Sequence, residues 1–457
     1  MGLSLQQSPE NKVGADRFFD SGINSRYSFK PRLLADRIMK ELTLMSDPST
    51  GLLYKWNGRY WEVFEKDHVR AMVIDLLGWE SQKNRIEDVL YQVVNLVTIP
   101  SGRRVNDRTD WVCLRNGMLN LRTFEMRPHD PEFYFTQILP VSFDPESTRR
   151  CERFERFLET NVAPPEAIEQ LQEFAGYCLV RHAKYEKCLL LLGPGADGKS
   201  KFMSILRELV GYDNCAAVSF QELEKEFHRS SLYGKLLNVS TEIGGQAVES
   251  SYFKAIASGD AINGAFKHQD VFEFTPYCKL VFAGNTMPRV KDNSDGFFRR
   301  ILPVQFKRQF HEDDPERDPH LMDKLREELS EIFHWALCGL KRLEERQRFT
   351  DCDETRALLM AYRRLNNPIL CYVEDECVLG VDQEISKADL YSNYRKYCFT
   401  NGYTPAGLAN FFRELYAAVK SIDVYRPRHT KKRERLLRGI GLKEQPGSSP
   451  TTGGIDP

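Results

Sequence analysis

The chain has 457 residues and a mass of 52.9 kDa, more than one hydrophobic core usually supports, so several domains are expected. Lysine plus arginine number 64 against 65 aspartate plus glutamate. This balance excludes a uniformly basic nucleic-acid binder, so any DNA contact must come from a local patch. No apolar run reaches the roughly 18 residues of a membrane span, and the first residues lack the pattern of a secretory signal.

The cysteines and the first 24 residues give two further expectations. Eleven scattered cysteines without a CxxC pair predict reduced thiols in a cytosolic protein and no structural zinc. Residues 1–24 are polar and without periodicity, which predicts a loose N-terminus.

Residues 25–150 combine helical and strand signals, which predicts an α+β domain. A helical stripe of apolar residues covers residues 31–42. The pairs Asn57-Gly58 and Asn116-Gly117 each separate two short apolar runs, the strongest local signal for a β-hairpin. The tryptophans in these runs favour cross-strand packing over base stacking; they are Trp56, Trp61 and Trp111.

Residues 151–187 read as a helical connector, and residues 188–350 as an α/β nucleotide-binding core. The core opens with an apolar strand over 188–192, a glycine-rich loop and a helix from Ser200 to Val210, with Gly211 as its C-cap. The loop fits the phosphate-binding pattern G-x-x-x-x-G-K-[ST]; its residues are Gly193, Pro194, Gly195, Ala196, Asp197, Gly198, Lys199 and Ser200. The sequence therefore predicts ATP binding, with Lys199 on the β- and γ-phosphates and the Ser200 hydroxyl on Mg²⁺.

Three polar signals follow at strand ends. Glu242 follows an apolar run that begins at Leu236. A carboxylate there is suited to hold the water shell of the metal ion or to polarise the attacking water; the alternative is a surface glutamate at a strand end. Asn285 ends the run 279–284 and suits a γ-phosphate sensor, against a turn asparagine. Arg299 and Arg300 precede another apolar strand. An arginine at this place is suited to act as an arginine finger in the ATP site of a neighbouring subunit; the alternative is a pair of solvent-exposed arginines.

The segment 355–442 predicts a compact C-terminal domain, and 443–457 has the composition of a disordered tail. An apolar stripe along residues 405–419 is followed by YRPRHTKKRERLLR over 425–438, with seven basic residues and one acidic one. A buried helix before a basic hairpin resembles a winged helix whose wing lies against DNA phosphates, through Lys431, Lys432 and Arg433. The alternative is a solvated charge run.

Taken together, these motifs resemble superfamily 3 helicases, a compact AAA+ branch that includes phage/plasmid and poxvirus-type primase–helicases. The most telling part is FKAIASGD-AINGAFKH over 253–268 with VFEFTP over 271–276, which looks like the family's extra β-hairpin in the ring channel. LRNGMLNLRT over 114–123 resembles the hairpin of the preceding domain. The resemblance implies an AAA+ P-loop core, an α+β N-terminal domain and a C-terminal winged-helix-like domain.

The same resemblance assigns roles to individual residues. It implies Lys199 and Ser200 for ATP and Mg²⁺, Glu242 as the acid, Asn285 as sensor and Arg300 as the likelier finger, with Arg299 as the fallback. It also implies Lys267 and His268 at a DNA-gripping hairpin tip. Two departures stand out: Asp197 replaces a common asparagine, and Thr241-Glu242 replaces a pair of acids, which leaves open whether Glu242 binds the metal shell or acts as base.

The expected function is an ATP-dependent DNA helicase, a ring-shaped hexamer that moves 3′ to 5′ on single-stranded or forked DNA in replication of a phage, plasmid or mobile element. Its expected location is the cytoplasm of a bacterial cell. A separate chain is expected to supply any primase or polymerase, since the N-terminal domain lacks zinc-ribbon cysteines and a clear carboxylate pair. Two alternatives stay open: a P-loop metabolite kinase, and a DNA-binding initiator or adaptor without unwinding activity.

Overall fold

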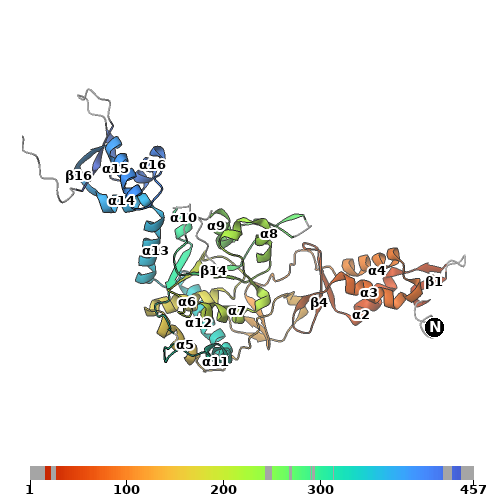
Figure 1. Ribbon diagram of the computed structural model, residues 1–457. Coiled ribbons are helices and arrows are strands. Elements are labelled where there is room, and N and C mark those ends of the chain that lie inside the picture. The colour runs from red at the N-terminus through yellow and green to blue at the C-terminus, as the bar shows by residue number, and fades with distance from the viewer. Residues whose placement is uncertain are drawn as a thin grey trace, which may run out of the picture.

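The computed structural model describes residues 16–21, 27–241, 250–266, 270–288, 290, 294–311, 313–425 and 435–443. Three units follow one another along an extended molecule (Figure 1). The N-terminal unit, in red and orange, lies at one end, the nucleotide-binding core in the middle, and the blue C-terminal unit at the other end. Within the expected loose N-terminus, residues 16–21 are described and form a short 3-10 helix and a strand. The rest of that segment, and the expected disordered tail beyond Lys443, lie outside the described residues.

The N-terminal unit packs three helices against a small antiparallel sheet. Val69, Val73 and Val93 are fully buried where the helices meet. The helix and the hairpin that the sequence predicts over residues 31–63 are both confirmed. The elements are η2 (Asp16–Phe18), β1 (Phe19–Ser21), β2 (Tyr27–Phe29), α2 (Pro31–Glu41), β3 (Leu44–Asp47), β4 (Leu52–Trp56), β5 (Trp61–Val63), α3 (Lys66–Leu77), η3 (Gly78–Glu80) and α4 (Lys83–Leu96).

A second hairpin joins this unit to the core. Strands β6 (Trp111–Leu114), β7 (Gly117–Asn120) and β8 (Met126–Arg127), followed by η4 (Pro131–Phe133), form a three-stranded sheet whose side chains enter the main hydrophobic core. The predicted packing role of the tryptophans is confirmed, since Trp56 meets Trp61 edge to face and Trp111 meets Phe133.

The core is a five-stranded parallel sheet with helices on its faces. The strand order is β10-β11-β14-β9-β15, and every pairing is parallel. The predicted strands and the predicted helix ending at Gly211 are confirmed. The elements are α5 (Glu152–Asn161), α6 (Pro165–Tyr177), β9 (Cys188–Leu192), α7 (Lys199–Val210), η5 (Tyr212–Asn214), β10 (Cys215–Ala216), η6 (Gln221–Glu224), α8 (Glu226–Arg229), η7 (Ser230–Leu232), β11 (Leu237–Ser240), α9 (Ser251–Ser258), β12 (Ile262–Ala265), β13 (Val271–Phe274), β14 (Lys279–Gly284), α10 (Asp295–Phe298), β15 (Ile301–Gln305), α11 (Leu321–Glu327) and α12 (Leu329–Arg346).

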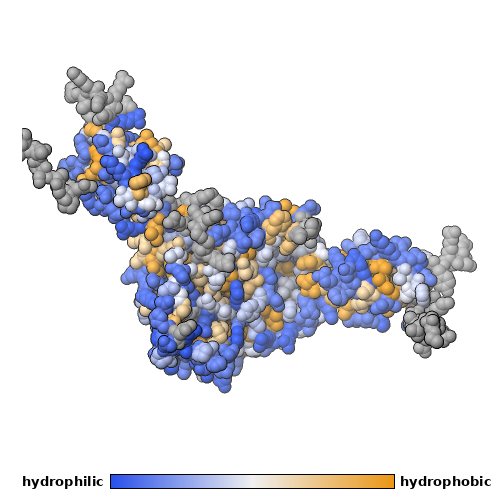
Figure 2. Space-filling model, in the orientation of Figure 1, coloured by the Kyte–Doolittle hydropathy of each residue, from blue (hydrophilic) through white to orange (hydrophobic). Residues whose placement is uncertain are grey.

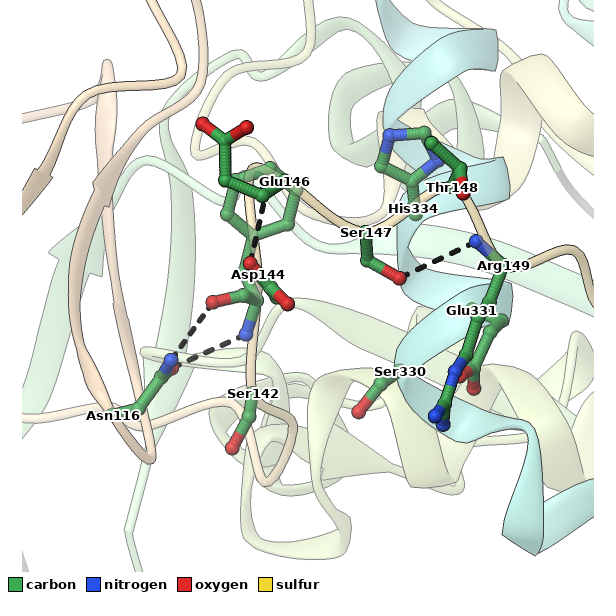
Figure 3. Close-up of a pocket in the computed structure, with 11 residues that line it drawn as sticks. Asn116, Ser142, Asp144, Glu146, Ser147, Thr148, Arg149, Ser330, Glu331 and His334 are labelled. Atoms are coloured by element: carbon green, nitrogen blue, oxygen red, sulfur yellow. Dashed lines mark hydrogen bonds between the residues drawn. The ribbon is translucent and has the colours of Figure 1, made fainter.

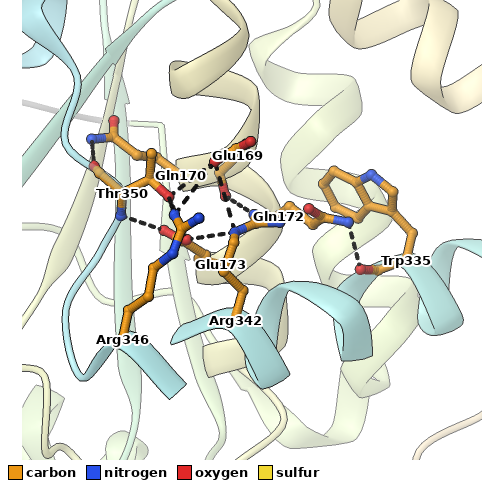
Figure 4. Close-up of polar contacts among 8 residues, drawn as sticks. All are labelled: Glu169, Gln170, Gln172, Glu173, Trp335, Arg342, Arg346 and Thr350. Carbon is orange, nitrogen blue, oxygen red and sulfur yellow. Dashed lines mark hydrogen bonds and ion pairs between the residues drawn. The ribbon is translucent and has the colours of Figure 1, made fainter. Parts of the chain in front are cut away.

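The connector helix α6 is fixed against α12 by close backbone contact and a buried polar cluster. A Cβ at Gly176 or Gly339 would collide with the backbone of the opposing helix, so both positions need glycine. Beside the crossing, the fully buried Glu173 accepts from Arg342 Nε at 2.8 Å and from the backbone N–H of Thr350 at 2.8 Å (Figure 4). A buried carboxylate is tolerated there because each oxygen has a donor.

The C-terminal unit follows helix α13 (Asp353–Asn366), which belongs by packing to the core. Tyr362 of α13 is fully buried, and its hydroxyl donates to the Pro288 carbonyl at 2.8 Å. The unit beyond it has its own hydrophobic core and a sheet in the order β16-β18-β17. Its elements are α14 (Pro368–Glu376), β16 (Cys377–Ser386), α15 (Lys387–Thr400), α16 (Leu408–Ala418), β17 (Asp423–Tyr425) and β18 (Leu436–Leu442).

The surface is mostly hydrophilic, with apolar side chains in small separate patches on the visible face (Figure 2). Within the described ranges, no helix is both long enough and apolar enough to cross a bilayer.

Candidate functional site

The phosphate loop lies at the carboxyl end of β9, the strand second from the edge of the parallel sheet. Gly195, Ala196 and Gly198 all have positive φ, at 102°, 50° and 93°. Glycine adopts this conformation without cost, and it turns successive backbone N–H groups to one side of the loop. Helix α7 starts directly after the loop, so its N-terminal N–H groups face the same space.

The loop holds an anion in this structure, the carboxylate of its own Asp197. Asp197 Oδ2 accepts from the N–H of Gly195 at 3.2 Å, and Oδ1 accepts from the N–H of Lys199 at 3.3 Å. The Lys199 ammonium donates to Asp197 Oδ2 and to the Gly193 carbonyl at 3.0 Å. Both side chains are buried, at 2% and 6% exposure. The loop therefore binds negative charge with the groups that a phosphate requires.

These features fit the expected nucleotide and magnesium ion. The loop N–H groups and Lys199 suit phosphate oxygens, and the exposed Ser200 lies at the loop's edge where its hydroxyl is free for a metal ion. Among the described residues, no three or more histidine, cysteine or acidic side chains gather into a separate metal site.

Residues far from the motif support the loop from behind. The backbone N–H of Phe310 donates to the Ala196 carbonyl at 2.9 Å, and that of Phe306 donates to the Leu192 carbonyl at 2.7 Å. Gly198 lies so close to the Phe157 ring that a Cβ there would collide with it. Sequence reasoning missed these contacts because Phe157 and Phe310 belong to no motif. The one related signal was the predicted helical connector over 151–187, which contains Phe157.

The strand order brings the predicted sensor to the loop. Strand β14 pairs with β9 so that Gly284 lies opposite Leu192, and Asn285 therefore follows at the level where the loop begins. Asn285 is exposed at this edge. Strand β11 lies on the other side of β14 and ends at Ser240, also at the carboxyl edge. The predicted acid Glu242 lies outside the described residues.

The two arginines lie at the opposite edge of the sheet. They precede β15, whose Ile301 is level with Cys188, so the five residues of β9 separate them from their own phosphate loop, roughly 16 Å. The Arg299 side chain is 60% exposed, whereas that of Arg300 is 10% exposed. Glu186 Oε2 pairs with both, at 2.9 Å and 3.0 Å.

The buried Arg300 guanidinium is fully engaged within its own chain. Its Nε and Nη2 donate to Ser258 Oγ at 3.0 Å and 2.5 Å, and its Nη1 donates to the Gly296 carbonyl at 2.5 Å. Arg300 therefore ties the start of β15 to the end of α9.

The hairpin that the sequence predicts after α9 is present as a separate antiparallel pair of β12 and β13. Ala265 pairs with Val271 at the outer end of this pair, and the two strands run out beside α8 (Figure 1). Phe266 and Phe272 stack at 4.8 Å between ring centroids next to the tip. Lys267 and His268 lie outside the described residues.

A buried arginine holds the base of this hairpin. Arg229 of α8 is 3% exposed, donates to the Asn263 carbonyl at 3.0 Å and to the Leu223 carbonyl at 3.1 Å, and lies over the Tyr252 ring. The sequence analysis did not identify Arg229, because a single basic residue in a short helix has no distinguishing pattern.

A polar hollow of about 560 Å³ lies away from the phosphate loop, between residues 142–149 and α12 (Figure 3). The Asn116 side chain exchanges two hydrogen bonds with the Phe143 backbone, and the Phe143 ring stacks on His334. The hollow is therefore a junction that fixes the N-terminal hairpin to the core, and its lining lacks a phosphate-binding loop.

Three family models match consecutive parts of the chain. "D5 N terminal like" matches residues 32–162, a "Family of unknown function" matches 191–300, and "Poxvirus D5 protein-like" matches 364–441. A putative helicase of Acanthamoeba polyphaga mimivirus is 22% identical over 222 residues, which cover 46% of this chain. The match spans only 23% of that protein, so the chain corresponds to about a quarter of its relative's length.

Solved structures support the fold. An apo structure of the NrS-1 C-terminal region covers 90% of this chain and 99% of its own, with a TM-score of 0.56 and 11% identity. A second crystal form covers 91% and 100%, with a TM-score of 0.54 and 10% identity. The family matches place residues 32–162 and 364–441 in D5-like families, so both ends of the chain are similar to poxvirus D5-like primase–helicases, while the solved structures show the shared fold alone.

Proposed function

We propose that this chain is an ATP-driven DNA helicase with an AAA+ core. The observation that carries the proposal is the strand order, which sets β14 between β9 and β11. The phosphate loop, Asn285 and the strand leading to Glu242 thereby share one edge of the sheet. In parallel sheets, ligands bind at the carboxyl ends of the strands, where the order of connections changes.

ATP bound here supplies the phosphoryl group whose hydrolysis drives the motor, with Mg²⁺ neutralising phosphate charge. Lys199 and the loop N–H groups hold the phosphates, and Ser200 contributes to the metal site. Asn285 orients the attacking water or contacts the terminal phosphate, and Glu242 polarises that water or fills the metal's water shell. Water exclusion comes from the buried wall behind the loop, which includes Phe157 and Phe306.

The motor is proposed to act as a hexameric ring. The arginine pair lies on the opposite edge of the sheet from its own loop, so a role at an ATP site requires a neighbouring subunit. The more exposed Arg299 reaches across by exchanging its ion pair with Glu186, while Arg300 acts from its fixed position between α9 and β15. Either arginine, placed near the terminal phosphate, would stabilise developing charge.

DNA contact is assigned to two regions. We propose that Lys267 and His268 bind the backbone of the translocating strand. The β12–β13 hairpin supports this proposal, because it is a separate pair of strands whose outer end carries the stacked rings of Phe266 and Phe272. Lys431, Lys432 and Arg433, which lie outside the described residues, are proposed to bind duplex phosphates. The proposed setting is 3′-to-5′ unwinding during replication of a mobile element in a bacterial cytoplasm, with priming supplied by another chain.

The double change Lys267→Ala, His268→Ala tests this proposal. Assembly and ATP hydrolysis without DNA should stay near parental values, because neither residue belongs to the phosphate-binding motif. Strand separation on a forked substrate should fall by about an order of magnitude or more, since backbone contacts carry most non-specific affinity. Parental unwinding rates in the double variant would reject the hairpin's role, and a parent without DNA-stimulated ATPase would reject the helicase function. A metabolite kinase would show no such stimulation.

A further inference from the structure

Helix α13 holds the chain directly behind the predicted sensor, Asn285. The Tyr362 hydroxyl donates to the Pro288 carbonyl at 2.8 Å, and Asn366 Oδ1 accepts from the backbone N–H of Val290 at 3.0 Å. Pro288 and Val290 lie three and five residues beyond Asn285, whereas Tyr362 and Asn366 lie more than 70 residues further along the chain. Two side chains about one helical turn apart therefore bind the segment that leaves the sensor.

This contact lies in the protein interior. Tyr362 is fully buried, and Pro288 and Val290 are buried as well. Tyr362 and Val290 belong to the same hydrophobic cluster, and Met287 packs against that cluster. Asn366 Nδ2 donates to the Tyr362 carbonyl at 3.0 Å, which orients the amide so that its oxygen faces Val290. Hydrogen bonds in such surroundings have little competition from water, so they define the position of the segment closely.

Helix α13 is itself fixed to the core. Thr355 Oγ1 donates to Gln170 Oε1 of α6 at 2.7 Å, and Lys307 pairs with Glu354 at 2.7 Å, so the first turn is held from two sides. Further along, the helix packs on β15, and it then continues toward the C-terminal unit (Figure 1). A helix anchored in this way presents its side chains in a defined geometry.

We infer that Tyr362 and Asn366 are positioning residues for ATP hydrolysis, which act by holding Asn285 in place at the carboxyl edge of the sheet. Since the role of Asn285 rests on the proposed function, so does theirs. Asn285 is exposed, so its place beside the phosphate loop depends on the backbone on either side of it. Pairing with β9 fixes the strand before it, and α13 fixes the chain after it. A group that orients water or phosphate must be placed to within about 0.5 Å.

The test compares ATP hydrolysis by the full-length chain in Tyr362→Phe and in Asn366→Ala. We expect kcat to fall roughly tenfold in each, because a small misplacement of a catalytic group slows the reaction strongly. Binding of a non-hydrolysable ATP analogue should stay within about twofold of the parent, because the phosphate loop holds the nucleotide. Tyr362→Phe keeps the ring, which meets Phe298 edge to face at 5.4 Å, so only the hydroxyl is lost. Asn366→Asp keeps an oxygen for the Val290 N–H and should restore most of the rate.

Combination with Asn285→Ala separates positioning from general structural damage. If Tyr362 acts through the sensor, Tyr362→Phe should lower kcat no further in a chain that already carries Asn285→Ala. Tyr372→Phe is the matched control, since it also removes the hydroxyl of a fully buried tyrosine from a carbonyl, that of Leu390 at 3.1 Å in the C-terminal unit. It should destabilise the protein and leave kcat at the parental value.

Three results would overturn the inference while the assignment of ATP hydrolysis stands. They are a parental kcat in both Tyr362→Phe and Asn366→Ala, an equal loss of kcat in Tyr372→Phe, and a loss in Tyr362→Phe that adds in full to that of Asn285→Ala. A parental kcat in Asn285→Ala would overturn it as well, because no sensor would then be positioned. A parent that does not hydrolyse ATP would overturn the proposed function, and the inference with it.

Discussion

The Asp197 carboxylate contacts the Lys199 ammonium inside the phosphate loop, and both side chains are buried. The two loop N–H groups of Gly195 and Lys199 also donate to this carboxylate. A phosphate group must therefore compete with a charged group of the protein for the same donors. The aspartate at position 197, where the family resemblance led us to expect asparagine, thus alters the charge of the site itself.

Asp197→Asn should strengthen binding of a non-hydrolysable ATP analogue by about tenfold. The change removes a negative charge close to the phosphates while it keeps an oxygen that accepts from the loop N–H groups. Equilibrium titration with a fluorescent analogue measures the effect, and Asp197→Ala, which loses the accepting oxygen too, is the comparison variant. Weaker binding in Asp197→Asn would mean that the carboxylate supports the nucleotide-bound loop.

Lys199→Ala should abolish ATP hydrolysis, because it removes the charge that holds the phosphates. The single variant also leaves the buried Asp197 carboxylate without its cation, which typically costs several kcal/mol of stability. The double variant Lys199→Ala, Asp197→Asn avoids this penalty and should melt near the parental temperature while it stays inactive. Hydrolysis within a few-fold of the parent in the double variant would refute the assignment of the site.

The sequence predicted those parts of the molecule whose signal is local. The strand, loop and helix around Lys199 were predictable because three local patterns follow one another in the chain: an apolar run for the strand, a glycine-rich turn, and apolar residues at helical spacing. The two hairpins were predictable for the same reason, from Asn-Gly turns. Leu408 is a different case. The apolar stripe along residues 405–419 predicted that its side chain is buried, but Leu408 is the first residue of α16 and is 55% exposed.

The remaining features depend on contacts between distant segments. Nothing near Glu186 in the sequence indicates that it pairs with Arg299 and Arg300, more than 110 residues later. Likewise, Arg229 supports a hairpin that begins about 30 residues downstream. The burial of Arg300 was equally hidden, because two adjacent arginines carry no information on which of them faces inward.

The stability of the core should rise with pH between 7 and 8. Burial lowers the pKa of Lys279 from 10.5 to about 7, where its ammonium group lies against the Val180 and Tyr277 carbonyls. Between these two pKa values Lys279 binds its proton in the unfolded chain but not in the folded one, so raising the pH from 7 to 8 favours folding, by on the order of 1 kcal/mol from this group.

Lys279→Met should flatten this pH dependence, whatever its effect on stability at a single pH. Urea unfolding at several pH values measures it. The window stops at pH 8 because burial raises the pKa of cysteines such as Cys178, whose thiols therefore ionise first in the unfolded chain and reverse the slope at higher pH. Burial also lowers the pKa of His182 to about 4, so His182 contributes its own loss of stability between pH 6.5 and 4. An unchanged slope in Lys279→Met would show that another group titrates.

The arginine pair should separate into two roles. Arg299→Ala removes a half-exposed side chain, so the protein should fold and bind ATP like its parent yet lose hydrolysis by about two orders of magnitude or more if Arg299 reaches a neighbour. Arg300→Ala leaves Ser258 and the Gly296 carbonyl without their donor, so it should also lower the melting temperature.

Mixing experiments then identify the finger. An inactive Lys199→Ala subunit still carries both arginines, so adding it to Arg299→Ala subunits creates interfaces that pair an intact loop with an intact finger. Partial recovery of hydrolysis with Arg299→Ala, measured against mixing ratio in rings shown to be mixed, would identify Arg299 as the group that acts across the interface. Recovery with Arg300→Ala alone would assign that role to Arg300, and its burial would then have to be relieved when the ring assembles. Recovery with neither variant would exclude a finger in trans from this pair.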